Sequence, residues 1–354
     1  MKKHISFPSI EQFRNVVTNI NRQFNFVGLD DNGDAIYDHN KIKPKLTFTG
    51  SVKLHGTNAS ICYNRIDGLW IQSRENIITP EQDNAGFAFF VVSNQGVFST
   101  LMAEIMVKNN LDMDQNTISI YGEWCGGNIQ KGVGICNLEK SFFIFGVKIT
   151  PHFVGEELAV NEKPPVAYWV DHTYLKSPAN KVYNISDYKT FSIEIDFNYP
   201  EMVQNKLGEL TLEVEEECPV AKAFGFSGVG EGIVWACEFN GVVHRFKVKG
   251  SLHAAKSKVK TLSKVDDVKI TKAREIADKV TPNWRLDQMI EKSCDLMNGG
   301  ELDRAKLGIY LKLVMDDVLK EDLDILVEAG LEPKDVSKYV SEIARRYFFD
   351  QEKV

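Results

Sequence analysis

Residues 45–64 read KLTFTGSVKLHGTNASICYN, and this stretch decides the fold of the first half of the chain. It is rich in β-branched and apolar residues and is broken at Gly50 and Gly56, which predicts paired strands. Lys53 lies inside it, two residues before His55-Gly56. Because an ammonium group is costly to desolvate without a partner, a lysine here needs an explanation. Taken alone, Lys53 would be a solvated lysine of an edge strand.

Further strand patterns follow this stretch along the chain. Residues 231–250, EGIVWACEFNGVVHRFKVKG, predict a hairpin that turns at Asn240-Gly241. Other short apolar runs bounded by turn-forming residues also predict strands, and they cover residues 68–76, 117–125 and 141–149. We therefore expect antiparallel sheets in this part of the protein.

Helical spacing of apolar residues flanks the strands. Residues 9–24 show this spacing with Ser9 as the expected cap, and residues 83–110 show it with an interruption near 94–96. After about residue 262 the composition changes, and the pattern over 267–349 is helical throughout. The predicted fold class is α+β, with antiparallel sheets and flanking helices over residues 1–262. A small all-α domain over residues 263–354 follows.

Composition describes an ordinary globular protein. The chain has 354 residues, of which 43% are hydrophobic and 26% charged, so it can bury two sizeable cores. The six cysteines are scattered without a CxxC pair, which is typical of reduced thiols in the cytoplasm. The N-terminus lacks the apolar core of a signal peptide, and no apolar run approaches the length of a bilayer span. We therefore expect a cytoplasmic monomer that does not enter a membrane.

Several familiar catalytic motifs do not occur in the sequence. The glycine-rich stretch GGNIQKGVG, residues 126–134, lacks the GxxxxGK[ST] spacing of a P-loop. The stretch GVGEG, residues 228–232, imitates part of a dinucleotide fingerprint, but no βαβ pattern surrounds it. No HExxH or nucleophile-elbow motif stands out either.

What remains is a set of charged residues near the ends of the predicted strands. They are Lys53, Arg74, Glu123, Glu231, Lys247 and Lys249. Lysines two apart on a strand point to the same face and repel each other, which favours a polyanion between them. A nucleophilic lysine, two phosphate-binding lysines and two glutamates form the minimum set for nucleotidyl transfer. In such a site a carboxylate-bound Mg²⁺ would help to neutralise the transferring phosphoryl group.

The motifs resemble those of the RNA ligase 2 type family, the ligases that seal nicks in double-stranded RNA. KLHGTN resembles the KxHGTN nucleotidyl-transfer motif of that family. The segments SREN, YGEWCGGNIQKGV, FFIFGVKI, GEGIVW and FKVKG follow in the family's order and at similar separations. The resemblance spans Lys53 to Lys249. It implies an ATP-grasp-like nucleotidyltransferase domain, and the helical C-terminal domain fits the family as well.

The resemblance implies ATP and Mg²⁺ or Mn²⁺ as cofactors, and RNA with 5′-phosphate and 3′-OH ends as the partner, most simply a nicked duplex. Lys53 would become lysyl-AMP, with AMP then passing to the RNA 5′-phosphate before the 3′-OH attacks. Each of the other motif residues would then contact the nucleotide, the metal or the turn that holds Lys53. His55, Gly56 and Asn58 would shape the turn. Arg74 would contact AMP or the 5′-phosphate, Glu123 would contact the ribose, and Phe145 would stack on the adenine. Glu231 would assist the metal and the lysine, while Lys247 and Lys249 would contact the α-phosphate.

Two positions depart from the family pattern. Val52 stands where a glutamate that helps to read the adenine is common, and Gly146 stands where an aspartate commonly follows the stacking phenylalanine. Both changes concern base recognition and metal positioning and not the lysine chemistry. Two alternatives stay open: a related nucleotidyltransferase with DNA or another acceptor, such as a cap guanylyltransferase, and a catalytically silent protein that binds RNA ends.

The net charge of −7 argues against a protein that is basic all over, so an RNA-binding surface must be local. Residues 241–264 hold seven Lys or Arg and no Asp or Glu, which predicts a track for RNA phosphates. The candidates on this track are Lys256, Lys258 and Lys260. From Asp266 onward the chain has 15 basic and 20 acidic residues, so any RNA-binding face there must be local. The candidate residues for such a face are Arg345 and Arg346. A solvated helix end is an equally good interpretation of these two residues.

Overall fold

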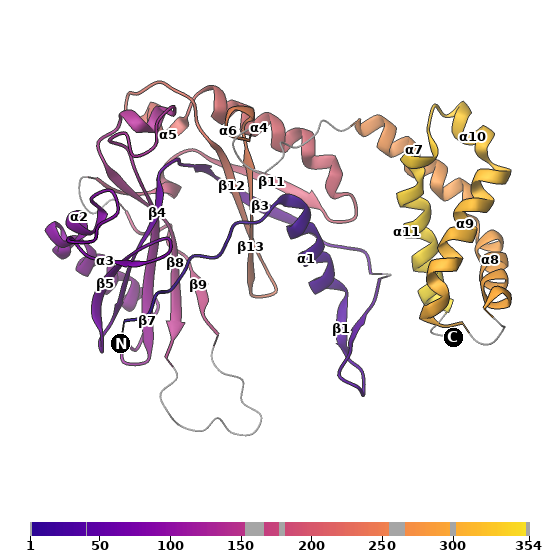
Figure 1. Ribbon diagram of the computed structural model, residues 1–354, viewed down its shortest axis with the longest axis horizontal. Helices are drawn as coiled ribbons and strands as arrows, with labels where there is room; N and C mark the ends of the chain where they lie inside the picture. Colours follow the sequence, from indigo (N-terminus) through magenta and orange to yellow (C-terminus); the bar gives the residue numbers. More distant parts are fainter. Residues whose placement is uncertain are drawn as a thin grey trace. The chain divides into compact units, whose positions relative to one another are not determined.

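The computed structural model describes residues 2–39, 41–152, 166–176, 181–254, 266–297 and 302–351. The chain divides into two compact units (Figure 1). The first comprises Met1–Thr18, Lys45–Ile195 and Asn205–Leu262, and the second comprises Asn19–Pro44, Asp196–Gln204 and Ser263–Val354. Two stretches that precede residue 262 thus belong with the second unit. The domain boundary expected at residue 262 lies outside the described residues.

The first unit contains two sheets. In the larger one, the strands follow the order β10-β8-β7-β4-β5-β6, and β9 pairs with β8. Their bounds are β4 (Thr57–Asn64), β5 (Gly68–Ser73), β6 (Ile77–Ile78), β7 (Asn116–Cys125), β8 (Ser141–Pro151), β9 (Tyr168–Val170) and β10 (Val182–Asn184). In the smaller sheet, the order is β11-β3-β12-β13, with β3 (Lys45–Lys53), β11 (Thr190–Asp196), β12 (Gly232–Phe239) and β13 (Val242–Lys249).

The predicted mixed fold with antiparallel sheets is confirmed. The strand pairs of these two sheets whose register is described are antiparallel, except that β8 and β10 are parallel. β12 and β13 form the predicted hairpin, and Asn240 and Gly241 have φ angles of 48° and 74° at its turn. Positive φ at both central residues is what a two-residue hairpin turn of this type requires.

Helices cover one face of the larger sheet. The predicted interrupted helix is α2 (Phe87–Ser93) and α3 (Gln95–Lys108), which pack with the sheet around a core that includes Phe98, Ile120 and Phe142. The other helical elements of this unit are α4 (Gln204–Glu216, whose first residue belongs to the second unit), α5 (Pro219–Ala223), α6 (Ser251–Ala254), η1 (Gly134–Asn137) and η2 (Ile185–Asp187). Among the described residues, no single helix is long and apolar enough to cross a bilayer, and α2 and α3 reach that length and composition only as a pair bent by 81°.

The smaller sheet has one apolar and one charged face. Phe48, Trp235 and Phe246 are fully buried on the apolar face, and Phe13 contacts Phe246 with ring centroids 5.0 Å apart. Because side chains alternate along a strand, Lys53 of β3 and the odd-numbered residues at the end of β13 point to the opposite face. The packing of this sheet thus aims the predicted site residues to one side.

The first helix starts later than its sequence pattern predicts. The apolar spacing over 9–24 suggested Ser9 as the cap, but α1 spans Phe13–Asn25. Glu11 instead pairs with β13, because its N–H donates to the Arg245 carbonyl at 3.3 Å and its carbonyl accepts from the Lys247 N–H at 3.2 Å. These strand-like bonds keep the residues before Phe13 extended.

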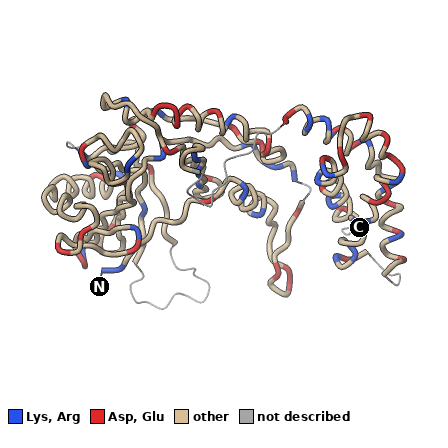
Figure 2. The backbone as a smooth tube through the Cα atoms, turned by 45° about the horizontal axis from the view of Figure 1, so that its top comes forward, with Lys and Arg blue, Asp and Glu red and all other residues tan. Residues whose placement is uncertain are grey.

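The second unit is mainly helical, as predicted. Its elements are the hairpin β1 (Phe26–Leu29) and β2 (Ala35–Tyr37), η3 (Pro200–Val203), α7 (Asp267–Val280), α8 (Asn283–Leu296), η4 (Arg304–Lys306), α9 (Leu307–Glu321), α10 (Leu323–Glu328) and α11 (Pro333–Gln351). Glu201 attaches its segment to the helices, since its carboxylate accepts from Arg274 at 2.7 Å and from Tyr339 at 3.1 Å. Figure 2 shows Lys/Arg and Asp/Glu interspersed in both units, with acidic residues at the tip of the β1–β2 hairpin.

Candidate active site

A buried glutamate, Glu231, gathers the predicted site residues. Its Oε2 accepts from Lys53 Nζ at 2.7 Å and contacts His55 Nδ1 at 3.1 Å, and its Oε1 lies 2.7 Å from Lys249 Nζ. Strand register explains the convergence, because Gly232 on β12 pairs with Lys53 on one side and with Lys249 on the other. We call Lys53, His55, Glu231 and Lys249 the lysine–glutamate cluster.

The cluster keeps Glu231 ionised. Burial works to raise the pKa of this carboxyl group, but the His55 hydrogen bond and the ion pairs with Lys53 and Lys249 outweigh it and hold the pKa well below its usual range. An ionised carboxylate only accepts hydrogen bonds, so Nδ1 of His55 carries a proton and donates it. The Nε2 atom of His55 is therefore the nitrogen left to contact a substrate.

A second glutamate holds the turn that follows Lys53. Glu123 Oε1 accepts the Gly56 backbone N–H at 2.9 Å, and Asn58 lies directly opposite Glu123 in the β4–β7 register. A Cβ atom at position 56 would lie 2.4 Å from the Trp124 carbonyl oxygen and 2.6 Å from Cys125 Cβ. Only glycine fits between these atoms, so the HGTN turn is pressed against β7.

The pKa of Glu123 is shifted upward, whereas the pKa of Glu231 is shifted downward. Desolvation raises the pKa of Glu123 to about 7, while the charge of Lys53 and the Gly56 hydrogen bond offset part of that effect. Glu123 therefore titrates near neutral pH. The site thus holds one carboxylate that is ionised at neutral pH and one that takes up a proton near it.

Two further cations of the predicted set lie at this site. Burial lowers the pKa of Lys247, and the charges of Lys249, Lys53 and Arg74 lower it further. Arg74 itself is more than half exposed, and its Nε lies 3.3 Å from Glu75 Oε1. Lys247 forms no ion pair within the described part of the chain, so positive charge exceeds negative charge here. This excess suits a phosphate group.

Phe145 belongs to a group of rings beside the lysine–glutamate cluster. Phe7 contacts Phe145, Tyr121 and Trp169 with centroid separations of 5.1, 5.2 and 5.3 Å, and we call these four residues the aromatic cluster. The Arg245 guanidinium lies 4.0 Å from the Trp169 ring centroid, and burial lowers the Arg245 pKa to about 10. Arg245 shares a face of β13 with Lys247 and Lys249, so the two clusters adjoin along this strand.

Val52 and Gly146, the two departures from the family pattern, both lie against apolar or aromatic residues. Val52 is 3% exposed and lies on the face of β3 opposite to Lys53, among the apolar residues. A Cβ atom at Gly146 would lie 3.2 Å from Trp169 Cζ3 and 3.8 Å from Phe7 Cε2. The space that an aspartate would need is thus filled by the aromatic cluster.

Sequence reasoning missed His253 in this region. Its ring lies 5.5 Å from that of His55 in an edge-to-face arrangement, and α6 is anchored because Glu215 accepts from Leu252 N at 2.7 Å and from Ser251 Oγ at 3.0 Å. The only available signal was its position four residues after Lys249. Phe7 was missed too, because nothing local in the sequence links it to Phe145.

The predicted RNA-contacting lysines are not tested by the structure. Lys256, Lys258 and Lys260 lie outside the described residues. Arg345 and Arg346 are exposed on α11 in the second unit, which fits a solvated helix end and a local RNA face equally well.

The arrangement of these residues suits nucleophilic attack by a lysine on a phosphate group. It presents a lysine amine beside a carboxylate, with two more lysines and an arginine nearby to neutralise phosphate charge. Within the described residues, no group of three or more His, Cys, Asp or Glu side chains could hold a metal ion by itself. A divalent cation here would need oxygen ligands from a bound nucleotide, as Mg²⁺ commonly does.

The sequence profile of the RNA ligase family matches residues 46–249, which is more than half of the chain. The chain belongs to the RNA ligase family. The matched region starts within β3 and ends at Lys249, so it contains the whole lysine–glutamate cluster. No curated protein sequence matches the chain.

Similar solved structures include ligases from Naegleria gruberi. The Naegleria RNA ligase with PPi matches at 16% identity and a TM-score of 0.39, over 72% of this chain and 58% of that chain. A variant with ATP and Mn matches at 15% identity and a TM-score of 0.40, and a variant with AMP and Mn at 14% and 0.39, both over the same shares. This member of the RNA ligase family thus spans less than two thirds of the length of those structures.

Proposed function

We propose that this protein is an ATP-dependent RNA ligase that joins 3′-OH and 5′-phosphate ends through lysyl-AMP on Lys53. Membership of the RNA ligase family supports a ligase function. The observation that carries the mechanism is the lysine–glutamate cluster, in which one buried carboxylate aligns two lysines and a histidine.

In the first step, the Lys53 amine attacks the α-phosphorus of ATP, forming an N–P bond while the bond to the bridging oxygen breaks and pyrophosphate leaves. Lys53 must give up a proton before it attacks, and Glu231 Oε2, which accepts its hydrogen bond at 2.7 Å, is the acceptor in place for that proton. Lys247 and Lys249 would neutralise the charge on the transferring phosphoryl group. AMP then passes to the RNA 5′-phosphate, and the RNA 3′-OH displaces AMP.

The remaining roles follow from where the residues lie. Glu123 and Asn58 face each other across β4 and β7 beside the Gly56 turn, where a ribose hydroxyl would be bound. Phe145 presents its ring to adenine, and Arg74 remains accessible to AMP or to the RNA 5′-phosphate. Mg²⁺ or Mn²⁺ would be held by Glu231 together with phosphate oxygens, and it would supply further neutralisation of phosphate charge.

A labelling experiment tests the proposal. Purified protein incubated with [α-³²P]ATP and Mg²⁺ should form a covalent radiolabelled adduct that Lys53→Ala abolishes. Lys45→Ala is the matched control, because Lys45 begins the same strand and is exposed. Equal label in wild type and Lys53→Ala would refute the assignment of the nucleophile, and no label in the wild type would favour a silent RNA-end-binding protein.

The acceptor is the finer part of the proposal. By resemblance to the RNA ligase 2 type family, we propose a nick in duplex RNA as the preferred substrate, a monomeric enzyme, a cytoplasmic location, and RNA phosphate contacts from Lys256, Lys258 and Lys260. Sealing assays on nicked RNA, RNA–DNA hybrid and DNA duplexes, with single-stranded RNA as a control, distinguish this from a ligase with a DNA acceptor. Competing ATP against GTP in the labelling assay separates it from a guanylyltransferase.

A further inference from the structure

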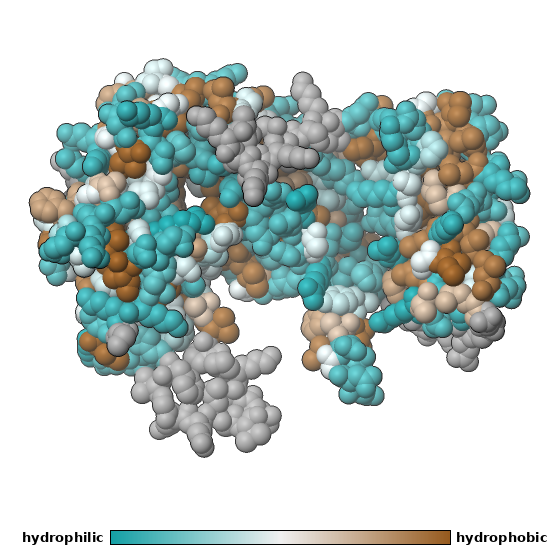
Figure 3. Space-filling model, viewed as in Figure 1, coloured by the Kyte–Doolittle hydropathy of each residue, from teal (hydrophilic) through white to brown (hydrophobic). Residues whose placement is uncertain are grey.

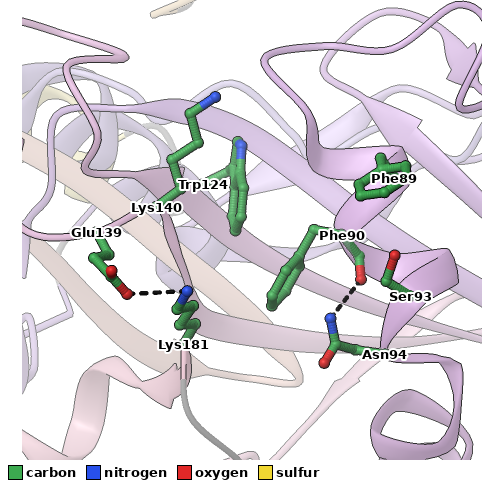
Figure 4. Close-up of a pocket in the computed structure, with 8 residues that line it drawn as sticks. All are labelled: Phe89, Phe90, Ser93, Asn94, Trp124, Glu139, Lys140 and Lys181. Atoms are coloured by element: carbon green, nitrogen blue, oxygen red, sulfur yellow. Dashed lines mark hydrogen bonds and ion pairs between the residues drawn. The ribbon is translucent and has the colours of Figure 1, made fainter.

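An open pocket of about 630 Å³ lies on the face of β7 that faces away from Glu123 (Figure 4). Glu123 and Trp124 are consecutive on this strand, so their side chains point to opposite sides. Trp124, Phe89 and Phe90 supply the aromatic part of the lining, and Glu139, Lys140 and Lys181 supply the charged part. None of these side chains has a role in the proposed transfer of AMP.

The aromatic rings form a base and an exposed rim. Trp124 is 2% exposed and contacts Phe90 with ring centroids 4.8 Å apart, so these rings form the base of the pocket. Phe89 is 66% exposed. Hydrophobic surface reaches the solvent at the left of Figure 3, where α2 lies in Figure 1. An exposed phenylalanine ring at the rim of an aromatic pocket offers a stacking surface for a planar group.

The charged rim favours an anionic ligand. Lys140 Nζ donates to the Ala85 carbonyl at 2.8 Å, and Lys181 Nζ lies 2.9 Å from Glu139 Oε2. Two lysines against one glutamate leave a positive charge at the mouth of the pocket. A planar group that carries a nearby negative charge is what a nucleotide presents.

A fixed loop connects this pocket to the turn that follows Lys53. Ala85 has a φ angle of 55°, unusual for a residue with a side chain, and its carbonyl also accepts from Trp124 Nε1 at 3.1 Å. The preceding residue, Asn84, donates from its amide to Thr57 Oγ1 at 3.0 Å. Asp83 accepts from the Ala88 and Phe89 backbone N–H groups at 2.7 and 2.9 Å. Residues 83–86 thus fix Phe89 and Lys140 relative to the HGTN turn.

We propose that this pocket binds a nucleotide of the RNA strand close to the ends being joined, with its base stacked on Phe89 and its phosphate near Lys140 and Lys181. The inference rests on the proposed function, since it names the part of the substrate that this surface takes. An uncharged peptide would use the rings but not the lysines. The hydrogen bond from Asn84 to Thr57 joins the loop of the pocket to the turn that follows Lys53.

Binding of RNA can be measured without catalysis. We would titrate the full chain, in EDTA and without ATP, into a fluorescein-labelled nicked RNA duplex and follow the anisotropy. Phe89→Ala should weaken binding about 5- to 150-fold, the range for loss of one stacked base. The double variant Lys140→Ala/Lys181→Ala should weaken binding and make it less dependent on salt. Val92→Ala, 52% exposed on the same helix, and Lys176→Ala, 73% exposed with an ion pair like that of Lys181, should bind as wild type.

The outcomes separate this inference from the proposed function. If all variants form the labelled lysyl adduct and Phe89→Ala and the double lysine variant bind RNA as wild type does, the pocket proposal is wrong and the ligase proposal stands. If Phe89→Ala and the double variant lose RNA binding while the wild type forms no adduct, the pocket proposal stands and the ligase proposal fails. Quenching of 2-aminopurine next to the nick, lost in Phe89→Ala, would support stacking at this position.

Discussion

The lysine–glutamate cluster and the aromatic cluster adjoin along β13, yet they are built on different principles. In the first, each cation contacts Glu231 through a short polar bond, and burial is balanced by charge. In the second, the buried guanidinium of Arg245 contacts rings and has no described acidic partner, so desolvation lowers its pKa to about 10. Hydrogen bonds and ion pairs to one carboxylate thus hold one end of the site in place, and ring packing holds the other.

The largest effect is expected from removing the charge at the centre of the lysine–glutamate cluster. Glu231→Gln removes the negative charge and one of the two acceptor oxygens shared by Lys53 and Lys249, so the free energy of unfolding should fall by about 3 kcal/mol, as for other broken buried ion pairs. Formation of lysyl-AMP should fall on the order of 100-fold, because both lysines lose their alignment. Urea denaturation and the labelling assay measure the two effects.

Glu215→Gln is the matched control for this prediction. Glu215 is also buried, at 6% exposure, but it accepts from neutral donors, Ser251 Oγ and Leu252 N. It should retain lysyl-AMP formation to within about threefold, since its hydrogen-bond partners among the described residues are neutral. A similar loss of label in Glu231→Gln and Glu215→Gln would show that removing any buried glutamate of this unit reduces lysyl-AMP formation. Glu231 would then have no distinct role.

A smaller effect, dependent on pH, is expected at Glu123. The pKa of Glu123 in the folded protein is about 7, which is above the ordinary value of 4.5. The raised pKa therefore contributes to the free energy of unfolding in full below pH 4.5, and this contribution is lost as the pH rises from 4.5 to 7. Glutamine mimics the neutral form. Relative to wild type, Glu123→Gln should therefore gain on the order of 2 kcal/mol of unfolding free energy between pH 4.5 and pH 8.

Glu231→Gln should show the opposite sign in a more acidic range. Because the Glu231 pKa is held well below its usual range, its contribution is present above the usual pKa and is lost as the pH falls. The deficit of Glu231→Gln relative to wild type should thus stay constant at neutral pH and shrink as the pH falls below the ordinary pKa of 4.5. Denaturation curves would contradict this comparison if the difference for Glu123→Gln between pH 4.5 and 8 and the difference for Glu231→Gln below pH 4.5 changed in the same direction with pH.

How far the sequence predicts each cluster depends on how local its determinants are. The strand patterns predict the hairpin at Asn240-Gly241 and hence the shared face of Lys247 and Lys249. The expectation that Glu231 lies near Lys53 came from the order of the family's motifs. The register of Gly232 with Lys53 and Lys249 is what physically brings them together.

The aromatic cluster could not be predicted in this way, because its rings come from distant segments. Phe7 belongs to an N-terminal stretch whose Ile5 N–H donates to the Gln72 side chain at 2.9 Å, and Trp169 follows a long connection after β8. No local pattern encodes such contacts. The misplaced start of α1 has the same cause, since the bonds of Glu11 to β13 are non-local and override the helical spacing.

The smallest effect tests whether ring packing explains Gly146. In Gly146→Ala, the added Cβ would lie 3.2 Å from Trp169 Cζ3, so the indole must shift and the free energy of unfolding should fall by about 1 kcal/mol. Gly96→Ala is the matched control, because nothing lies within 4 Å of its added Cβ and the site is in the first turn of α3, where alanine should not lower the free energy of unfolding. Trp169→Phe in the Gly146→Ala background should recover part of the loss, measured as a coupling energy in a double-mutant cycle. Additive losses would mean that the indole does not restrict position 146, and the absence of the family's aspartate would then need a cause other than the aromatic cluster.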